Sequence, residues 1–125
     1  MKIPEHYLPV IPYLILNDSK GFLEFTKKVF NATEQFVSKY ENGDIMHGEI
    51  KIHDAIIMFS QANENWGSKP AGMFIYIEDV DTIYKAGLCQ NAISLMPPDT
   101  KDYGYTGGFE DRFGNQWWLV QGEKE

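Results

Sequence analysis

The hydrophobic pattern of the first half of the chain predicts one strand, one helix and three further strands. Apolar residues fill positions 7–16, and apolar side chains then recur at helical spacing over about 20–30. Strand-forming residues follow in three stretches, at 33–40, 45–52 and 55–61. The first half is therefore expected to fold as a β-α-β-β-β unit.

The same order of elements returns after a polar linker at 62–71. We expect a strand at 73–77, a helix that begins after Asp79, and a short strand at 93–96. Prolines and polar residues at 97–104 predict a loop, and the final stretch, 106–121, predicts a hairpin with a Gly-Asn turn.

Two matches between the halves support an internal repeat. Segment 13–18 aligns with 74–79, and segment 52–61 aligns with 112–121, both at an offset of about 60 positions. A shared offset across a strand, a helix cap and a hairpin makes chance similarity a poor explanation. The chain is thus predicted to be one α+β domain over 1–125, with unit one at about 7–61 and unit two at about 72–121.

Charge and composition limit the classes of partner that the chain is expected to bind. The chain has 125 residues, a net charge of −7 and a single cysteine, Cys89, so no intrachain disulfide can form. Nucleic-acid binding needs clustered basic residues, and Lys27-Lys28 is the only adjacent basic pair, so neither DNA nor RNA is expected as a partner. No apolar run is long enough for a membrane span and the first residues lack a signal-peptide pattern, which makes a cytoplasmic location the expectation.

Seven short motifs, in this order and spacing, resemble the vicinal-oxygen-chelate superfamily, which includes glyoxalases, bleomycin-resistance proteins and extradiol dioxygenases. The resemblance is greatest to its PhnB-like branch. Arg112 stands where proline is common in the last hairpin of that family. The motifs, which together span nearly the whole chain, are Ile11-Pro12-Tyr13-Leu14, Phe22-Leu23-Glu24-Phe25, Met46-His47-Gly48-Glu49, Glu78-Asp79-Val80-Asp81, Met96-Pro97-Pro98, Tyr103-Gly104-Tyr105 and Asp111-Arg112-Phe113-Gly114.

The resemblance implies tandem βαβββ units that curl into a mixed-sheet cup, the glyoxalase/bleomycin-resistance fold, and it implies a homodimer. Metal-dependent members hold a divalent ion on the first and last strand of each unit. The corresponding positions here are Ile11, Gly72, Met58 and Trp118, none of which is a usual ligand for such an ion. We therefore expect neither a metal nor another cofactor.

His47 and Glu49 are the candidate catalytic residues. They lie two positions apart on one predicted strand, so their side chains leave the same face, which also carries Lys51. A His-x-Glu pair could begin a metal site, but His6 and His53 are not brought near it by any pattern. Three alternatives stay open: a polar pair that lines the cup, a histidine base oriented by the carboxylate, or an ordinary polar strand face.

Alternation along the strands predicts which side chains face the cup. The side chains predicted to point away from the cup are all apolar, as packing against helices requires. The side chains predicted to point into the cup include aromatic, apolar and polar types, as in a small-molecule pocket. Alternatively, these aromatic side chains simply fill the cup. The loop at 97–104 is expected at its rim, as a lid. The expected ligand-binding residues are Tyr13, Met58, Phe74, Tyr76, Tyr105, Gln116 and Trp118.

The leading hypothesis is a metal-free protein that binds a small, partly aromatic organic molecule. The alternative is a lyase, isomerase or dioxygenase of the same superfamily, with a non-standard site around His47 and Glu49. A third hypothesis is a filled cup, in which case the protein acts only through its dimer or another protein.

Overall fold

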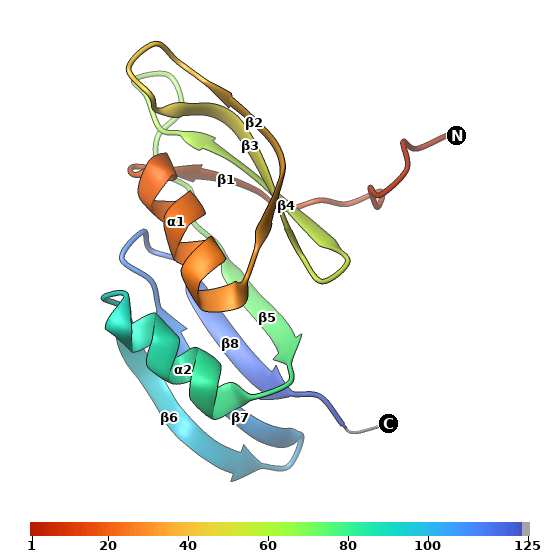
Figure 1. Cartoon of the computed structure of the whole chain (residues 1–125), viewed down its shortest axis with the longest axis vertical. Coiled ribbons are helices and arrows are strands. Elements are labelled where there is room, and N and C mark those ends of the chain that lie inside the picture. Colours follow the sequence, from red (N-terminus) through yellow and green to blue (C-terminus); the bar gives the residue numbers. More distant parts are fainter. Residues whose placement is uncertain (124–125) are drawn as a thin grey trace. The chain divides into compact units, whose positions relative to one another are not determined.

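The computed structural model describes residues 1–123 and divides the chain into two compact units, Met1–Pro70 and the residues from Ala71 onward. Each unit has the predicted β-α-β-β-β order (Figure 1). The elements of unit 1 are β1 (Tyr13–Leu16), α1 (Ser19–Phe30), β2 (Thr33–Lys39), β3 (Ile45–Ile52) and β4 (Ala55–Gln61). Those of unit 2 are β5 (Gly72–Ile77), α2 (Val80–Cys89), β6 (Ile93–Lys101), β7 (Gly104–Glu110) and β8 (Gln116–Gln121).

Each unit folds into one four-stranded mixed sheet. The strand orders are β1-β4-β3-β2 and β5-β8-β7-β6. In each sheet the first and last strands of the unit pair in parallel, and the other pairs are antiparallel. The predicted α+β class and the repeat of one unit are therefore confirmed.

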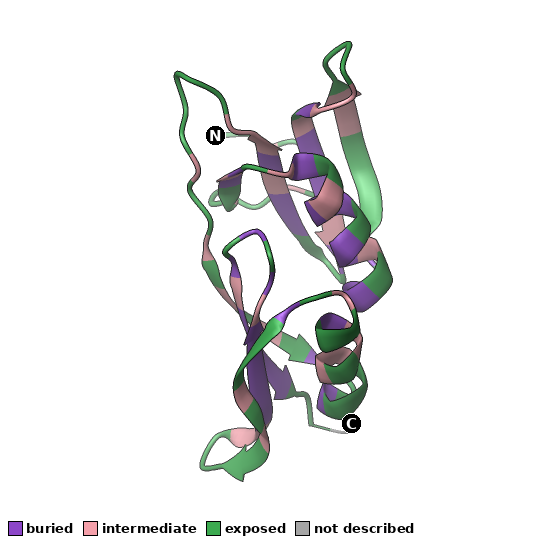
Figure 2. Ribbon diagram, turned by 90° about the vertical axis from the view of Figure 1, so that its left-hand side faces the viewer, coloured by how far each residue is buried: buried purple, intermediate pink, exposed green. Residues whose placement is uncertain are grey.

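One face of the unit 1 sheet packs against α1. The ring of Phe59 on β4 meets the ring of Phe22 on α1 edge-to-face, with 5.0 Å between ring centroids. Gly48, the partner of Phe59 on β3, has no room for a side chain, because a Cβ atom there would lie 2.5 Å from the Phe59 ring. Buried residues recur at helical spacing along α1, with exposed residues between them (Figure 2).

Unit 2 repeats this packing with different residues. Phe109 on β7 is fully buried beneath Gly87 of α2, where an added Cβ atom would lie 2.4 Å from its ring. Trp117, which pairs with Phe109, is also buried on this helix-covered face. A glycine in one layer thus makes room for a large aromatic ring in the other.

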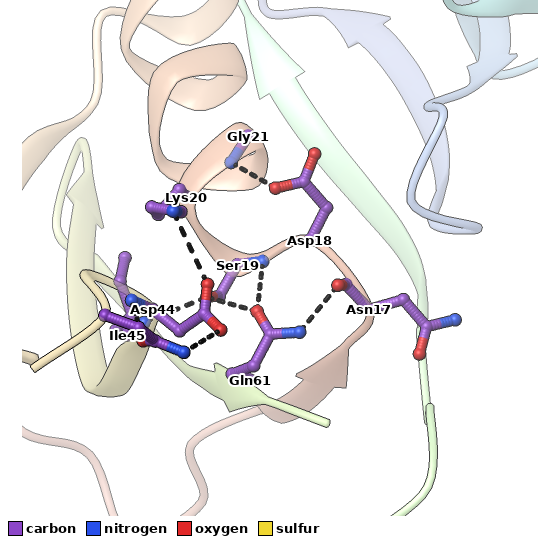
Figure 3. A network of polar contacts seen from close by, with 9 residues as sticks. Asn17, Asp18, Ser19, Lys20, Gly21, Asp44, Ile45 and Gln61 are labelled. Atoms are coloured by element: carbon purple, nitrogen blue, oxygen red, sulfur yellow. Dashed lines mark hydrogen bonds and ion pairs between the residues drawn. The ribbon is translucent and has the colours of Figure 1, made fainter. Parts of the chain in front are cut away.

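A glutamine at the end of the last strand holds the start of the helix in both units. In unit 1, the Oε1 of Gln61 accepts hydrogen bonds from the backbone N–H and the hydroxyl of Ser19, at 3.0 and 2.7 Å (Figure 3). Its amide donates to the carbonyl of Asn17 at 2.6 Å. In unit 2, Gln121 accepts from the backbone N–H of Val80 at 3.1 Å. The aligned glutamines therefore serve one structural role twice.

The turn between β7 and β8 is organised by the buried carboxylate of Asp111. It accepts hydrogen bonds from the backbone N–H groups of Phe113 and Asn115 and from the indole N–H of Trp117, the last at 2.8 Å. Asn115 in turn accepts from the backbone N–H of Ala71, which ties the turn to the start of β5. Burial raises the pKa of the Asp111 carboxyl, although these donors favour its charged form.

Two details of the predicted elements are wrong. The first strand begins at Tyr13 rather than at residue 7, because Pro9 and Pro12 cannot donate to a sheet. This strand, β1, lies at the edge of its sheet. The predicted lid loop at 97–104 does not form, since β6 continues to Lys101 and pairs with β7. Neither helix within residues 1–123 is long and apolar enough to cross a lipid bilayer.

Replacing Gln61 with alanine should lower the free energy of unfolding by about 1–2 kcal/mol, because three polar groups at the start of α1 lose their partner. Urea unfolding followed by circular dichroism measures the change. The matched control is Gln35→Ala, at an exposed position of β2. Equal midpoints for the two variants would contradict the role of Gln61.

Asp111→Asn should destabilise unit 2 by about 2 kcal/mol at neutral pH. The new amide places N–H groups where the carboxylate accepted hydrogen bonds from the Trp117 indole and the Asn115 amide. Asp102→Asn, in the exposed turn between β6 and β7, is the control. Thermal unfolding of both variants tests this, and an unchanged midpoint for Asp111→Asn would refute it.

Candidate functional site

The face of the unit 1 sheet opposite α1 carries a row of four cross-strand partners. Phe36 pairs with Glu49, Glu49 with Met58, and Met58 with Tyr13, so all four side chains leave the same side of the sheet. Phe59, one position further along, contacts α1, which places the row on the opposite face. We call this row, together with His47, the open face of unit 1.

A chain of hydrogen bonds joins four polar side chains on this face. The hydroxyl of Tyr7 donates to Oε1 of Glu49 at 2.5 Å. The Nε2 atom of His47 lies 2.8 Å from Oε2 of Glu49, and its Nδ1 atom lies 3.4 Å from the hydroxyl of Tyr13. The predicted pair, His47 and Glu49, is therefore in direct contact.

Burial differs sharply between the two members of this pair. Glu49 is only 6% exposed, whereas the His47 side chain is 30% exposed. A carboxylate removed from water needs hydrogen-bond donors, and Tyr7 and His47 supply one for each oxygen. The bond to Glu49, with burial and the nearby negative charge, raises the pKa of the Tyr7 hydroxyl.

Aromatic side chains surround the imidazole. The ring centroids of Tyr13 and Phe36 lie 5.7 and 6.1 Å from that of His47. Both side chains are half exposed, at 50% and 53%, and Met58 beside them is partly exposed. The open face of unit 1 thus combines accessible rings with a buried carboxylate.

Unit 2 presents an aromatic face of its own, opposite α2. Phe74 pairs with Trp118, and Gly72 pairs with Gln116, so Phe74, Gln116 and Trp118 share this face. Tyr76 lies two positions after Phe74, and their rings meet edge-to-face with centroids 5.5 Å apart. Phe74 and Tyr76 are 57% and 64% exposed. We call these four residues the open face of unit 2.

Tyr105 does not belong to that face, contrary to the prediction. It shares the parity of Phe109, whose ring packs beneath α2, and its hydroxyl donates to Asp81 of α2 at 2.6 Å. This bond raises the pKa of Tyr105. Its neighbour Tyr103 is exposed in the turn between β6 and β7.

Two residues of the unit 1 site, Phe36 and Tyr7, were not predicted from the sequence. Phe36 reaches the open face because the register of β2 shifts between Glu34 and Phe36, and such a bulge changes the parity of a strand. Tyr7 reaches Glu49 from a segment without regular structure, across 42 positions of sequence. Neither the bulge nor this long-range contact has a sequence signal.

The residues at the positions that the resemblance implies for a divalent ion do not suit such an ion. Met58 offers only a soft thioether, Trp118 an indole, and Gly72 no side chain at all. Within residues 1–123, His, Cys, Asp and Glu side chains form no cluster of three that could hold an ion. His47 and Glu49 provide two such groups, which are bonded to each other.

No protein-family model matches the sequence. Among curated proteins, an uncharacterized protein of Mycobacterium bovis, Mb0911c, is 23% identical over 126 aligned positions, which cover 91% of this chain and 83% of that protein. An uncharacterized protein of Mycobacterium tuberculosis, Rv0887c, is also 23% identical, with 91% of this chain and 74% of the relative covered.

Solved structures share the fold over more than nine-tenths of this chain. TioX from Micromonospora sp. ML1 superposes with a TM-score of 0.76 at 17% identity, covering 92% of this chain and 98% of its own. A PhnB protein from Bacillus cereus, described as a putative 3-demethylubiquinone-9 3-methyltransferase, gives 0.75 at 19%, covering 92% and 100%. A glyoxalase/bleomycin resistance protein/dioxygenase superfamily member from Sphaerobacter thermophilus gives 0.65 at 16%, covering 92% and 98%. The chain therefore has the fold of these proteins, as the resemblance of the motifs implied.

Glu49→Gln should lower the pKa of Tyr7 toward that of an ordinary tyrosine. The substitution weakens the hydrogen bond that the hydroxyl donates to the carboxylate, and it removes the negative charge that opposes ionisation. An NMR titration of tyrosines labelled at Cζ measures this, with Tyr7→Phe identifying the signal. Asp81→Asn is the reciprocal control, because it should shift Tyr105 and leave Tyr7 unchanged. An unchanged pKa of Tyr7 in the Glu49→Gln variant would contradict the contact between Tyr7 and Glu49.

Proposed function

We propose that this chain, which has the fold of the glyoxalase/bleomycin resistance protein/dioxygenase superfamily, binds a small, partly aromatic organic molecule on the open face of unit 1. The observation that carries the proposal is the hydrogen-bonded array of Tyr7, Glu49, His47 and Tyr13 on a sheet face that no helix of its unit covers. Small-molecule sites typically combine apolar walls with a few placed polar groups.

The exposure of the aromatic rings supports a binding surface over a simple core. Core rings of unit 1 such as Phe22 and Phe59 are fully buried, whereas Tyr13 and Phe36 keep half of their surface in contact with solvent. Accessible rings on either side of an imidazole offer stacking partners to a flat ligand. A ligand ring placed there would remove apolar surface from water, which favours binding.

The charge of the site favours ligands that carry a positive charge. Glu49 brings a carboxylate to this face, and the chain as a whole carries a net charge of −7. The rings of Tyr13 and Phe36 also attract cations. Lys51, which shares this side of β3, is the basic side chain that would oppose this preference.

Pairing of two copies belongs to the same proposal. The open face of unit 2 exposes Phe74 and Tyr76, and a contact between aromatic surfaces of two chains would bury them. Sedimentation velocity on the protein used for binding measurements determines whether two copies associate. A monomer that still binds ligand would remove pairing and leave the ligand site in place.

Tyr13→Ala should weaken binding of a small aromatic amine by about tenfold or more, because the ligand loses a stacking partner next to His47. Tryptamine, indole and indole-3-acetate serve as probes of matched size and different charge. Changes in the methyl signal of Met58 report binding on this face. Tyr103→Ala, which removes an exposed tyrosine from a turn in unit 2, is the matched control.

The expected order of affinity is tryptamine, then indole, then indole-3-acetate. Absence of saturable shifts at Met58 for all three probes would contradict the proposal. Equal losses for Tyr13→Ala and Tyr103→Ala would move the site away from the open face of unit 1.

A further inference from the structure

His47 has one ring nitrogen hydrogen-bonded to Glu49, and its other nitrogen lies 3.4 Å from the hydroxyl of Tyr13, a half-exposed side chain. We propose that His47 is a general base that removes a proton from the bound molecule, so that the chain catalyses a proton-transfer isomerisation or elimination. This inference rests on the proposed binding site and adds a reaction to it.

The geometry selects one tautomer of the neutral imidazole. Both oxygens of an ionised carboxylate can only accept hydrogen bonds, so Nε2 of His47, 2.8 Å from Glu49, carries the hydrogen. Nδ1 then holds a lone pair, toward which the Tyr13 hydroxyl can donate at 3.4 Å. A lone pair at Nδ1 is what a general base requires.

Glu49 acts as a positioning residue in this arrangement. It is almost fully buried, and the Tyr7 hydroxyl holds its second oxygen at 2.5 Å, so the carboxylate is fixed from two sides. A fixed carboxylate keeps the imidazole oriented and stabilises the imidazolium that forms after proton transfer. The partner of Glu49 on β4, Met58, brings no competing charge.

The Tyr13 hydroxyl marks where the reacting proton would lie. It is 3.4 Å from Nδ1, the outer limit of a hydrogen bond, so a ligand group can replace it at little cost. The side chains that face His47 from β1 and β2 are Tyr13 on β1 and Phe36 and Ser38 on β2, none of which carries a charge at neutral pH. The charged groups on its own strand are Glu49 and Lys51.

The proposed step is balanced without another reactant. Nδ1 takes a proton from an acidic C–H group, and the electron pair of that bond moves into a conjugated group or expels a leaving group on the next atom. In an isomerisation the imidazolium returns the proton to another atom of the same molecule. In an elimination it releases the proton to water.

The ring tautomer gives a test that needs no ligand. Long-range ¹H–¹⁵N spectra at pH 8 should show His47 with hydrogen on Nε2 and an unprotonated Nδ1. Glu49→Gln should make the two tautomers more equally populated, while Glu41→Gln, in an exposed turn, should not. A predominant Nδ1–H tautomer in the wild-type protein would overturn the proposal.

The reaction test uses 5-nitrobenzisoxazole, a flat aromatic molecule in which loss of the ring C–H proton breaks the N–O bond and yields a coloured phenolate. Wild-type protein should accelerate this reaction with saturation. His47→Gln should reduce the protein-dependent rate by about a hundredfold or more. Glu49→Gln should reduce the rate at saturating probe concentration, since Glu49 acts through the imidazole.

His53→Asn is the matched control. It removes an imidazole from the same unit at a turn position with φ of 50°, which asparagine tolerates. Its rate should equal that of the wild type. Equal rates for His47→Gln and the wild type would overturn the proposal that His47 is the general base.

Circular dichroism and the Met58 methyl signal show whether each variant is folded and binds the probe. Saturable binding without acceleration would overturn the reaction and leave the binding function intact. Absence of both binding and acceleration would overturn the two together.

Discussion

Within residues 1–123, one helix packs against each four-stranded sheet, and this constraint decides which side chains remain accessible. Alternation along β-strands sends successive side chains to opposite faces. The helix-covered faces carry fully buried rings such as Phe59 and Phe109. The absence of a side chain at Gly48 and Gly87 leaves room for these rings. The opposite faces cannot use those helices, so any polar or aromatic group placed there stays accessible or needs another partner.

The repeat conserves the scaffold and changes the open faces. Gln61 and Gln121 hold the two helix starts through the same kind of bond, which explains why both matched segments end in glutamine. The open faces differ because unit 1 carries a hydrogen-bonded histidine and carboxylate, whereas unit 2 carries Phe74 beside Tyr76. Structure is thus shared between the units, and chemistry is concentrated in the first.

The sequence predicted what depends on local pattern. Strand alternation placed Tyr13 and Met58 on one face, and a spacing of two placed His47 beside Glu49. It failed where tertiary pairing overrides local signals. Pro97 and Pro98 indicated a loop, yet β6 is an edge strand whose register shifts accommodate them.

The remaining failures have the same origin. A register shift in β2 turns Phe36 to the open face, and a contact across 42 positions brings Tyr7 to Glu49. Tyr105 was expected to bind the ligand, but its strand parity directs its side chain toward α2 instead.

Glu49 is the residue that stability alone explains least. Burying a carboxylate costs free energy, and its hydrogen bonds to Tyr7 and His47 offset that cost without exceeding what an apolar residue would contribute. Sequences depart from the locally most stable choice chiefly where function requires it. A buried acid that fixes a histidine, and leaves the other ring nitrogen toward an aromatic surface, therefore joins the binding and the proton-transfer proposals in one set of contacts.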